Sequence, residues 1–301
     1  MRIAVAATPL VAIPTLEALS ASTHELVAVI TQPDRAAGRG KEMRQSEVGK
    51  WATSNGIQLI KPNDPSELLE ISKAVDCVIT VGYGVLLPAE VFNAPRFGYL
   101  NLHFSLLPKW RGAAPVQRSI QAGDAVTGVT VFKLDEGMDT GPIYIQKTLS
   151  IPADYRSSEL FRELSILGAS AVLEALVKID GDEDPIAQTN SGASRAPKIS
   201  KDDARIDWIR TSDEILRDVR AFFPSPIAWT SFRDETIRIE RAVISHEKLR
   251  PGALSASSDS LHVGTGDGSL QIMQLTPAGK KSVDAKSWLN GARISSQDNF
   301  V

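Results

Sequence analysis

Cysteine is almost absent from this sequence, which contains Cys77 alone among its 301 residues. A single thiol excludes an internal disulfide and any multi-cysteine metal site. Cys77 lies in an apolar run that ends at Val81, so we expect it on a buried strand. The longest apolar runs are far too short to span a membrane. The amino terminus lacks the features of a secretory signal, so we expect a cytoplasmic protein.

Glycine motifs that bind nucleotides are also missing. The first expected strand-to-helix turn, residues 6–10, has no Gly-x-Gly-x-x-Gly, which a dinucleotide pyrophosphate needs for close backbone approach. A Gly-x-x-x-x-Gly-Lys-Ser/Thr segment is absent as well. NAD, FAD and ATP are therefore not expected. Three of the four histidines, His24, His246 and His262, are scattered without ligand spacing, so we expect no metal.

Charge differs between the two parts of the chain. The net charge is −3, which alone argues against a nucleic-acid-binding protein. Residues 1–188 carry 17 basic and 22 acidic side chains, whereas residues 189–301 carry 16 basic and 14 acidic ones. This asymmetry allows a locally basic face in the second part.

Apolar runs and helical patterns alternate in the first part of the chain. Strands are expected at 3–7, 26–31, 58–60, 77–81, 99–102 and 129–134, with helices near 13–20, 46–55, 65–73, 114–122 and 157–179. This alternation predicts an α/β fold with a Rossmann-like, mostly parallel sheet and helices on both faces. Ligands of such sheets bind beyond the carboxyl ends of the strands.

The pattern changes after about residue 207. One helix is expected at 212–222, and short strands follow at 228–232, 236–245, 261–264 and 270–275. Closely spaced turns predict a small antiparallel barrel or sandwich. We therefore predict a catalytic domain at 1–188, a linker at 189–206 rich in small and polar residues, and a second domain at 207–301.

The segment from Asn101 to Pro108 carries the strongest chemical signal. Asn101 and His103 are two residues apart, so on a strand their side chains point to the same side. An amide donor beside an imidazole suits a reaction in which a carbonyl oxygen gains charge and an amine loses a proton. Asp139 follows a later apolar run and can hold the histidine. Each feature alone has a structural explanation, because a proline or an aspartate commonly marks a turn.

Several motifs together resemble the formyltetrahydrofolate-dependent formyltransferases. They are Asn101-x-His103-x-Ser-Leu-Leu-Pro108, Arg111-Gly-Ala-Ala-Pro-Val-Gln-Arg118, Gly128-Val-Thr and Asp139-Thr-Gly141. Within that family the match is closest to the members that formylate initiator methionyl-tRNA, because residues 32–41, 205–208 and 277–281 also resemble theirs. The similarity covers nearly the whole chain. It implies an OB-like second domain, a monomer, and 10-formyltetrahydrofolate and initiator methionyl-tRNA as substrates.

The resemblance implies roles for individual residues. Asn101, His103 and Asp139 would be catalytic, with Asn101 on the oxyanion and His103 on the oxyanion or the proton. Asp139 would orient His103 and favour its charged form, or take the proton through water. The folate would contact Tyr83, Val85, Leu86, Leu87, Ser105, Leu106, Leu107, Pro108, Asp135, Glu136 and Asp139. From the bare sequence alone, the leucines at 86 and 87 are better explained as core, and the resemblance shifts that balance toward a pocket wall. Phe104 departs from the family, which usually has glycine there.

Basic residues are the predicted tRNA contacts. They are Arg35, Arg39, Lys41, Lys198, Lys201, Arg205, Lys280 and Lys281. Such side chains meet phosphates or base edges, although the loop at 32–41 can equally be a solvated loop. Two alternatives remain at this point. One is a formyltransferase acting on a small amine such as a nucleotide-linked amino sugar, and the other is a non-catalytic RNA-binding protein.

Overall fold

The chain forms two compact units in a computed structural model that describes residues 1–37, 42–295 and 297–301. Unit 1 comprises Met1–Pro115, Val126–Ser150 and Phe161–Ala196. Unit 2 comprises Val116–Ala125, Ile151–Leu160 and Pro197–Val301. Residues 189–196, which the sequence assigned to a linker, cluster with unit 1.

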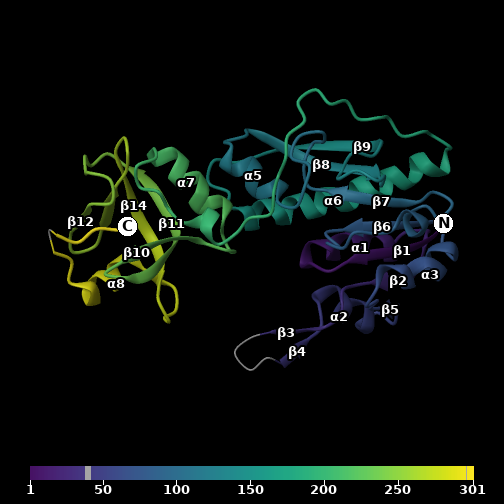
Figure 1. Cartoon of the computed structure of the whole chain (residues 1–301), viewed down its shortest axis with the longest axis horizontal. Coiled ribbons are helices and arrows are strands. Elements are labelled where there is room, and N and C mark those ends of the chain that lie inside the picture. Colours follow the sequence, from purple (N-terminus) through teal and green to yellow (C-terminus); the bar gives the residue numbers. More distant parts are fainter. Residues whose placement is uncertain (38–41, 296) are drawn as a thin grey trace. The chain divides into compact units, whose positions relative to one another are not determined.

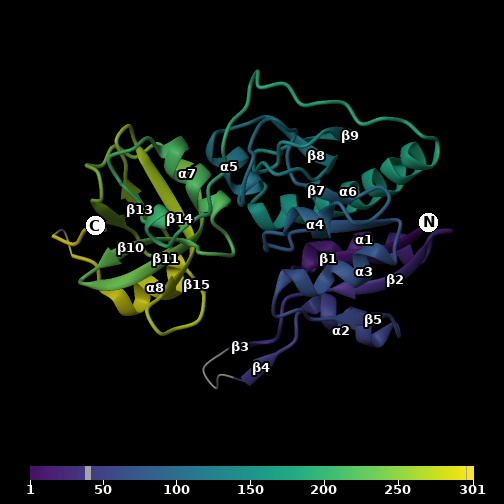
Figure 2. The same cartoon turned by 45° about the vertical axis from the view of Figure 1, so that its right-hand side comes forward.

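A seven-stranded sheet forms the centre of unit 1 (Figures 1 and 2), in the order β5-β2-β1-β6-β7-β8-β9. The strands are β1 (Arg2–Ala7), β2 (Glu25–Ile30), β5 (Gln58–Ile60), β6 (Cys77–Val81), β7 (Tyr99–His103), β8 (Val126–Lys133) and β9 (Ile143–Ser150). The first five strands in this order, β5, β2, β1, β6 and β7, pair in parallel. Strand β8 runs antiparallel to both of its neighbours, β7 and β9. The predicted mostly parallel, Rossmann-like sheet is confirmed.

The central strands are apolar on both faces because helices cover them. Every residue of β6 is buried, and burial raises the pKa of the Cys77 thiol to about 12. Strand β9 was not predicted. It is an edge strand that alternates half-buried and exposed residues over most of its length, so it lacks the continuous apolar run of the inner strands.

Helices flank this sheet (Figure 1). They are α1 (Ile13–Ser20), α2 (Glu47–Ser54), α3 (Leu69–Lys73), α4 (Ala89–Phe92) and α6 (Ser157–Asp180), with 3-10 turns at Leu10–Ala12 and Pro65–Leu68. Helix α5 (Pro115–Gln121) clusters with unit 2 from Val116 onward. Helix α6 approaches β7 closely at Gly168, where an added Cβ would lie 2.6 Å from the Leu102 side chain. Glycine therefore lets this helix pack against the strand that carries His103.

Unit 2 contains an antiparallel sheet in the order β10-β11-β14-β13-β12, with β15 beside β14. Its strands are β10 (Ala228–Phe232), β11 (Glu235–Ser245), β12 (Leu254–Ala256), β13 (Leu261–Gly264), β14 (Ser269–Pro277) and β15 (Val283–Asp284), and its helices are α7 (Ser212–Ala221), α8 (Ala285–Ala292) and the turn Asp202–Ala204. Trp208, Phe232, Trp288 and Phe300 form a ring cluster with centroids 5.2 to 6.1 Å apart. The predicted small β domain is confirmed.

A short hairpin leaves the end of β2. Its strands β3 (Arg35–Ala37) and β4 (Glu42–Arg44) pair antiparallel, with Arg35 opposite Arg44. The predicted tRNA contacts Arg39 and Lys41 lie outside the described residues. Within the ranges that the structure describes, no helix combines the length and hydropathy needed to cross a membrane.

Candidate active site

Strand β7 brings Asn101 and His103 to the carboxyl end of the sheet. It pairs in parallel with β6 and antiparallel with β8, so its backbone is fixed on both sides. The His103 side chain is buried, and its ring meets Phe132 of β8 edge-on, with centroids 6.5 Å apart. Asn101 is half-buried, and no hydrogen bond joins its amide to another described residue. A side-chain amide has two N–H donors.

The loop after β7 is held by its own polar groups. Ser105 is fully buried, and its hydroxyl donates to the Lys109 carbonyl over 2.6 Å. The Thr130 hydroxyl of β8 donates to the Ser105 carbonyl and accepts the Leu107 N–H. The Leu107–Pro108 peptide is cis. Ser105 therefore builds the loop rather than presenting a nucleophile.

Phe104 occupies the position where the family usually has glycine. Its ring is buried and packs edge-on against Phe161 of helix α6, with centroids 5.9 Å apart. The large side chain therefore fills space between the loop and the helix.

The two ring nitrogens of His103 have different partners. Nε2 lies 2.8 Å from the Trp110 carbonyl oxygen, and Nδ1 lies 3.7 Å from Oδ2 of Asp139. A carbonyl oxygen only accepts hydrogen bonds, so Nε2 carries the hydrogen. In the neutral ring Nδ1 is then the basic nitrogen, and it faces the carboxylate. Trp110 has a φ of 64°, and this left-handed conformation forms part of the bend that brings its carbonyl to the ring.

Asp139 is held from a second direction. Its Oδ2 accepts the Gly112 N–H over 2.7 Å. Gly112 has a φ of 124°, and a Cβ there would lie 2.7 Å from the Ala196 carbonyl oxygen, so only glycine fits. The loop after β7 thus supplies one contact to His103 and another to Asp139.

Burial decides the charge of His103. Burial lowers the pKa of the imidazole, while the Asp139 carboxylate and the Trp110 carbonyl raise it. The first effect is the larger one, so the pKa lies below the ordinary value and the resting ring is neutral at pH 7. The sequence led us to expect that Asp139 favours the charged form. That influence is present, but burial outweighs it.

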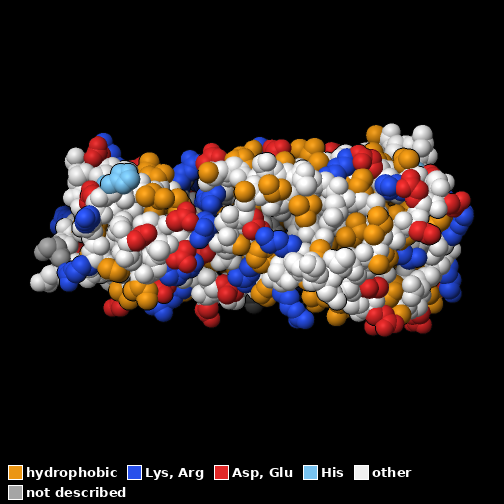
Figure 3. Space-filling model, turned by 90° about the horizontal axis from the view of Figure 1, so that it is seen from above, with side chains coloured by type: hydrophobic (Ala, Val, Ile, Leu, Met, Phe, Trp, Pro, Cys, Tyr) orange, Lys and Arg blue, Asp and Glu red, His pale blue; other side chains and the backbone are white. Residues whose placement is uncertain are grey.

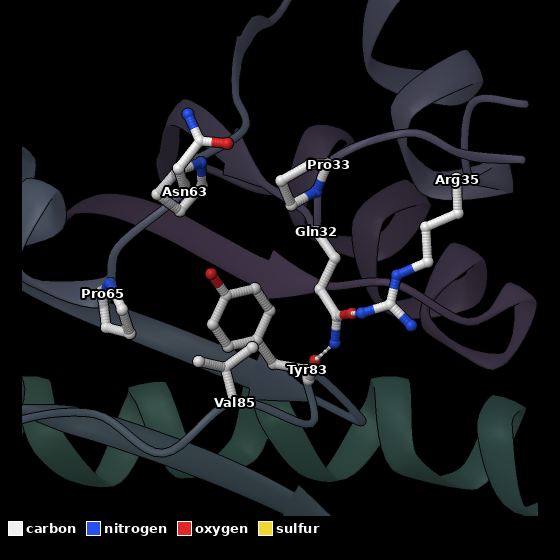
Figure 4. A pocket seen from close by; sticks show the side chains of 8 residues that line it. Gln32, Pro33, Arg35, Asn63, Pro65, Tyr83 and Val85 are labelled. Carbon is white, nitrogen blue, oxygen red and sulfur yellow. Dashed lines mark hydrogen bonds between the residues drawn. The ribbon is translucent and has the colours of Figure 1, made fainter. Parts of the chain in front are cut away.

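A cavity of about 270 Å³ lies beyond the carboxyl ends of β2, β5 and β6 (Figure 4). Its lining residues are Gln32, Pro33, Arg35, Pro62, Asn63, Pro65, Tyr83 and Val85. Gln32 donates to the Tyr83 carbonyl over 2.7 Å and accepts from Arg35, which ties the strand end to the hairpin. Burial raises the pKa of the Tyr83 phenol. Two predicted folate contacts, Tyr83 and Val85, line this cavity.

The other predicted folate contacts vary in exposure. Leu86 is 87% exposed, and Leu87 packs against the sheet core. Leu107 is buried, Leu106 and Pro108 are half-buried, and Glu136 is exposed. Asp135 accepts hydrogen bonds from the Gly137 N–H and the Thr140 hydroxyl, so it shapes the loop that leads to Asp139.

The predicted tRNA contacts in unit 2 are exposed. Lys198, Lys201 and Arg205 occupy one short stretch, and the cations of Lys201 and Arg205 lie 5.3 and 5.7 Å from the centre of the Trp229 ring. Lys280 and Lys281 occupy the turn between β14 and β15. On the face shown in Figure 3, basic and acidic side chains are interspersed.

Three contributors to this site had no signal in the sequence. The Trp110 carbonyl and the Gly112 N–H are backbone groups, whose directions depend on left-handed residues. Gln188 donates to the carbonyls of Asp139 and Gly141, and it follows the acidic Gly181–Pro185 turn in an extended segment.

Comparisons with known proteins define the class. A sequence model described as formyl transferase matches residues 1–176, and one described as formyl transferase, C-terminal domain, matches residues 198–293. The fold described above is therefore that of a formyl transferase.

The relatives narrow this class. A methionyl-tRNA formyltransferase from Salinispora tropica is 43% identical over 305 residues, which cover 98% of this chain and 98% of that protein. The chain therefore belongs to the methionyl-tRNA formyltransferase family, and the resemblance predicted from its motifs is confirmed.

Solved structures share the fold at low identity. HypX from Aquifex aeolicus, in complex with tetrahydrofolic acid, has a TM-score of 0.66 at 20% identity over 96% of this chain. The alignment covers 47% of HypX, so this chain spans about half of its length. An N-formyltransferase from Helicobacter canadensis, in complex with folinic acid and dTDP-3-aminofucose, has a TM-score of 0.69 at 21% identity, covering 90% of this chain and 97% of that one.

Proposed function

We propose that this protein transfers the formyl group of 10-formyltetrahydrofolate to the α-amine of methionine on initiator tRNA. One observation carries the proposal: His103, with Nδ1 3.7 Å from the Asp139 carboxylate, shares a face of strand β7 with the side-chain amide of Asn101. The 43% identity to a methionyl-tRNA formyltransferase supports the choice of acceptor. We expect the protein to work in the cytoplasm, beside the translation machinery.

The proposed reaction uses these groups in turn. The amine attacks the formyl carbon, a C–N bond forms, and the formyl oxygen gains negative charge. The Asn101 amide donates a hydrogen bond to that oxygen. His103 accepts the proton that the amine loses at Nδ1, directly or through a water molecule, and Asp139 stabilises the resulting imidazolium. Returning the proton to N10 as the C–N10 bond breaks releases tetrahydrofolate and balances the reaction.

The folate donor is expected in the cavity beside Tyr83 and Val85 and along the loop from Ser105 to Pro108. This cavity is flanked by prolines and an aromatic ring, which suit the flat, apolar rings of a folate. HypX, which has this fold, was solved with tetrahydrofolic acid. No metal is needed for the proposed steps.

The acceptor tRNA is expected to meet basic side chains in both units. Arg35, Arg39 and Lys41 would contact the acceptor end, and Lys198, Lys201, Arg205, Lys280 and Lys281 would contact phosphates elsewhere. These assignments come from the sequence resemblance and from the exposure of the described members.

Formylation of the acceptor tests the proposal directly. The protein is incubated with 10-formyltetrahydrofolate and methionyl initiator tRNA, and formylmethionine is measured after hydrolysis. We expect product with wild type and almost none with His103→Ala. Folded protein that binds the folate but leaves the tRNA unformylated would contradict the proposal, and turnover of a nucleotide-linked amino sugar would then identify the small-amine alternative.

A further inference from the structure

The extended segment after α6, residues 186–196, runs beside the loop that follows β7, residues 104–112. Ser194 donates its N–H to the Pro108 carbonyl and accepts the Arg111 N–H, and Ala196 donates to the Arg111 carbonyl. The Ser194 hydroxyl also accepts the Trp110 N–H over 2.9 Å. These hydrogen bonds therefore stabilise the backbone that presents the Trp110 carbonyl to His103.

Gln188, in the same segment, has every hydrogen-bonding position of its amide occupied. Its Nε2 donates to the carbonyls of Asp139 and Gly141, over 2.9 and 2.8 Å. Its Oε1 accepts from Nε and Nη2 of Arg111, over 3.2 and 2.7 Å. The partners fix the orientation of the amide, because a flipped amide would place its N–H groups against the guanidinium.

Asp139 needs such a support because its backbone is strained. Its φ of 55° is in the left-handed region, which non-glycine residues rarely adopt, and it belongs to no helix or strand. Conformations of this kind persist where neighbouring groups over-determine them. Gln188 holds the Asp139 carbonyl, and the Gly112 N–H holds its carboxylate.

The same amide also holds the other side of the pair. Arg111 lies between Trp110, whose carbonyl accepts the His103 Nε2–H, and Gly112, whose N–H binds Asp139. Gln188 thus connects the two loops that define the distance between His103 Nδ1 and Asp139 Oδ2.

We infer that Gln188 is a positioning residue for the catalytic pair, setting the place of Asp139 relative to His103 through its own amide. The inference rests on the proposed function, in which that pair moves the proton. Gln188 itself touches no substrate in this account. Its loss acts on the charge and tautomer of His103, whereas a merely structural glutamine would change stability alone.

The first experiment needs no substrate. The protein has only four histidines, so the ring ¹⁵N signals of His103 can be assigned by His103→Gln and followed against pH. Among the residues that the structure describes, the charged group at Nδ1 is the Asp139 carboxylate, Nε2 meets the Trp110 carbonyl, and the ring forms a T-shaped pair with Phe132. In Gln188→Ala we expect the midpoint to fall, as in Asp139→Asn, and the single Nε2–H tautomer to become mixed. An unchanged midpoint together with an unchanged tautomer would overturn the inference.

The second experiment measures formyl transfer. Gln188→Ala should lower kcat by about 10- to 100-fold, the cost of misplacing a catalytic group by roughly an ångström, with little change in KM. Gln188→Glu keeps the acceptors for Arg111 but loses both donors to the 139–141 loop, so it should be equally impaired. Gln58→Ala, on the exposed edge strand β5, is the matched control and should behave as wild type.

A double-mutant cycle then separates a positioning role of Gln188, which acts through Asp139, from a purely structural role. If Gln188 acts through Asp139, adding Gln188→Ala to Asp139→Asn should lower kcat little further. Full additivity, or wild-type kcat in the single variants, would overturn the inference. Absence of activity in wild type would instead contradict the proposed function, and the titration of His103 would still decide the role of Gln188.

Discussion

The candidate active site around His103 and the basic stretch from Lys198 to Arg205 differ in how firmly their side chains are held. His103 is 5% exposed, and each ring nitrogen faces a defined oxygen. Lys198, Lys201 and Arg205 are exposed, and the described contacts of the last two are with the face of Trp229. Proton transfer is sensitive to changes of a few tenths of an ångström in the distance between donor and acceptor, whereas attraction to a phosphate depends mainly on charge.

This difference predicts a hierarchy of effects. Substitution of Asn101 or His103 should lower kcat strongly, because one fixed group cannot be replaced by its neighbours. Substitutions in the basic stretch should weaken acceptor binding modestly, because several cations share the task.

The largest effect is expected for His103→Ala. Removing the imidazole deletes the proposed proton acceptor, so kcat should fall by up to about 10⁴-fold. Single-turnover formylation measures the chemical step, and circular dichroism confirms folding. If this variant kept a kcat within a few-fold of wild type, the proposed site would be wrong.

A somewhat smaller loss is expected for Asn101→Ala. Loss of one oxyanion donor should lower kcat by about 100- to 1,000-fold, with KM for both substrates nearly unchanged. Steady-state kinetics separates the two parameters. A variant in which KM for the folate rises while kcat stays constant would assign Asn101 to donor binding instead.

The basic stretch should respond through KM. The double variant Lys201→Ala and Arg205→Ala should raise KM for the tRNA by about tenfold at moderate salt. The slope of log affinity against log salt should become shallower by about 2, because about two phosphate contacts are lost. The double variant Lys50→Ala and Lys73→Ala removes the same number of exposed cations from α2 and α3 and serves as the control. Equal salt slopes in both variants would remove the stretch from the tRNA interface.

The sequence predicted those parts of the molecule that local patterns encode. The apolar run Cys77–Val81 gave β6, and the motif around Asn101 and His103 gave the strand end of the candidate site. Strand β9 was missed because an edge strand lacks such a run. Gln188 was missed because its partner Arg111 lies 77 residues away, and the Trp110 carbonyl because no side-chain type signals a left-handed φ there.

The smallest effect is expected in the pH dependence of kcat/KM. This dependence tests whether burial keeps His103 neutral at pH 7. Burial lowers the pKa of His103 below 6.5, and Asp139 opposes that shift. A base works in its neutral form, so kcat/KM for wild type should stay high at pH 7 and fall only as the pH drops through this lowered pKa. In Asp139→Asn the opposing carboxylate is lost, the pKa falls further, and the acid limb should move to lower pH while the plateau also drops. Profiles of kcat/KM from pH 5 to 8 measure both changes. A limb that moves to higher pH in Asp139→Asn would mean that the titrating group is not the imidazole held in this site. The Lys201→Ala and Arg205→Ala double variant removes exposed cations of unit 2 and should leave the limb where it is in wild type.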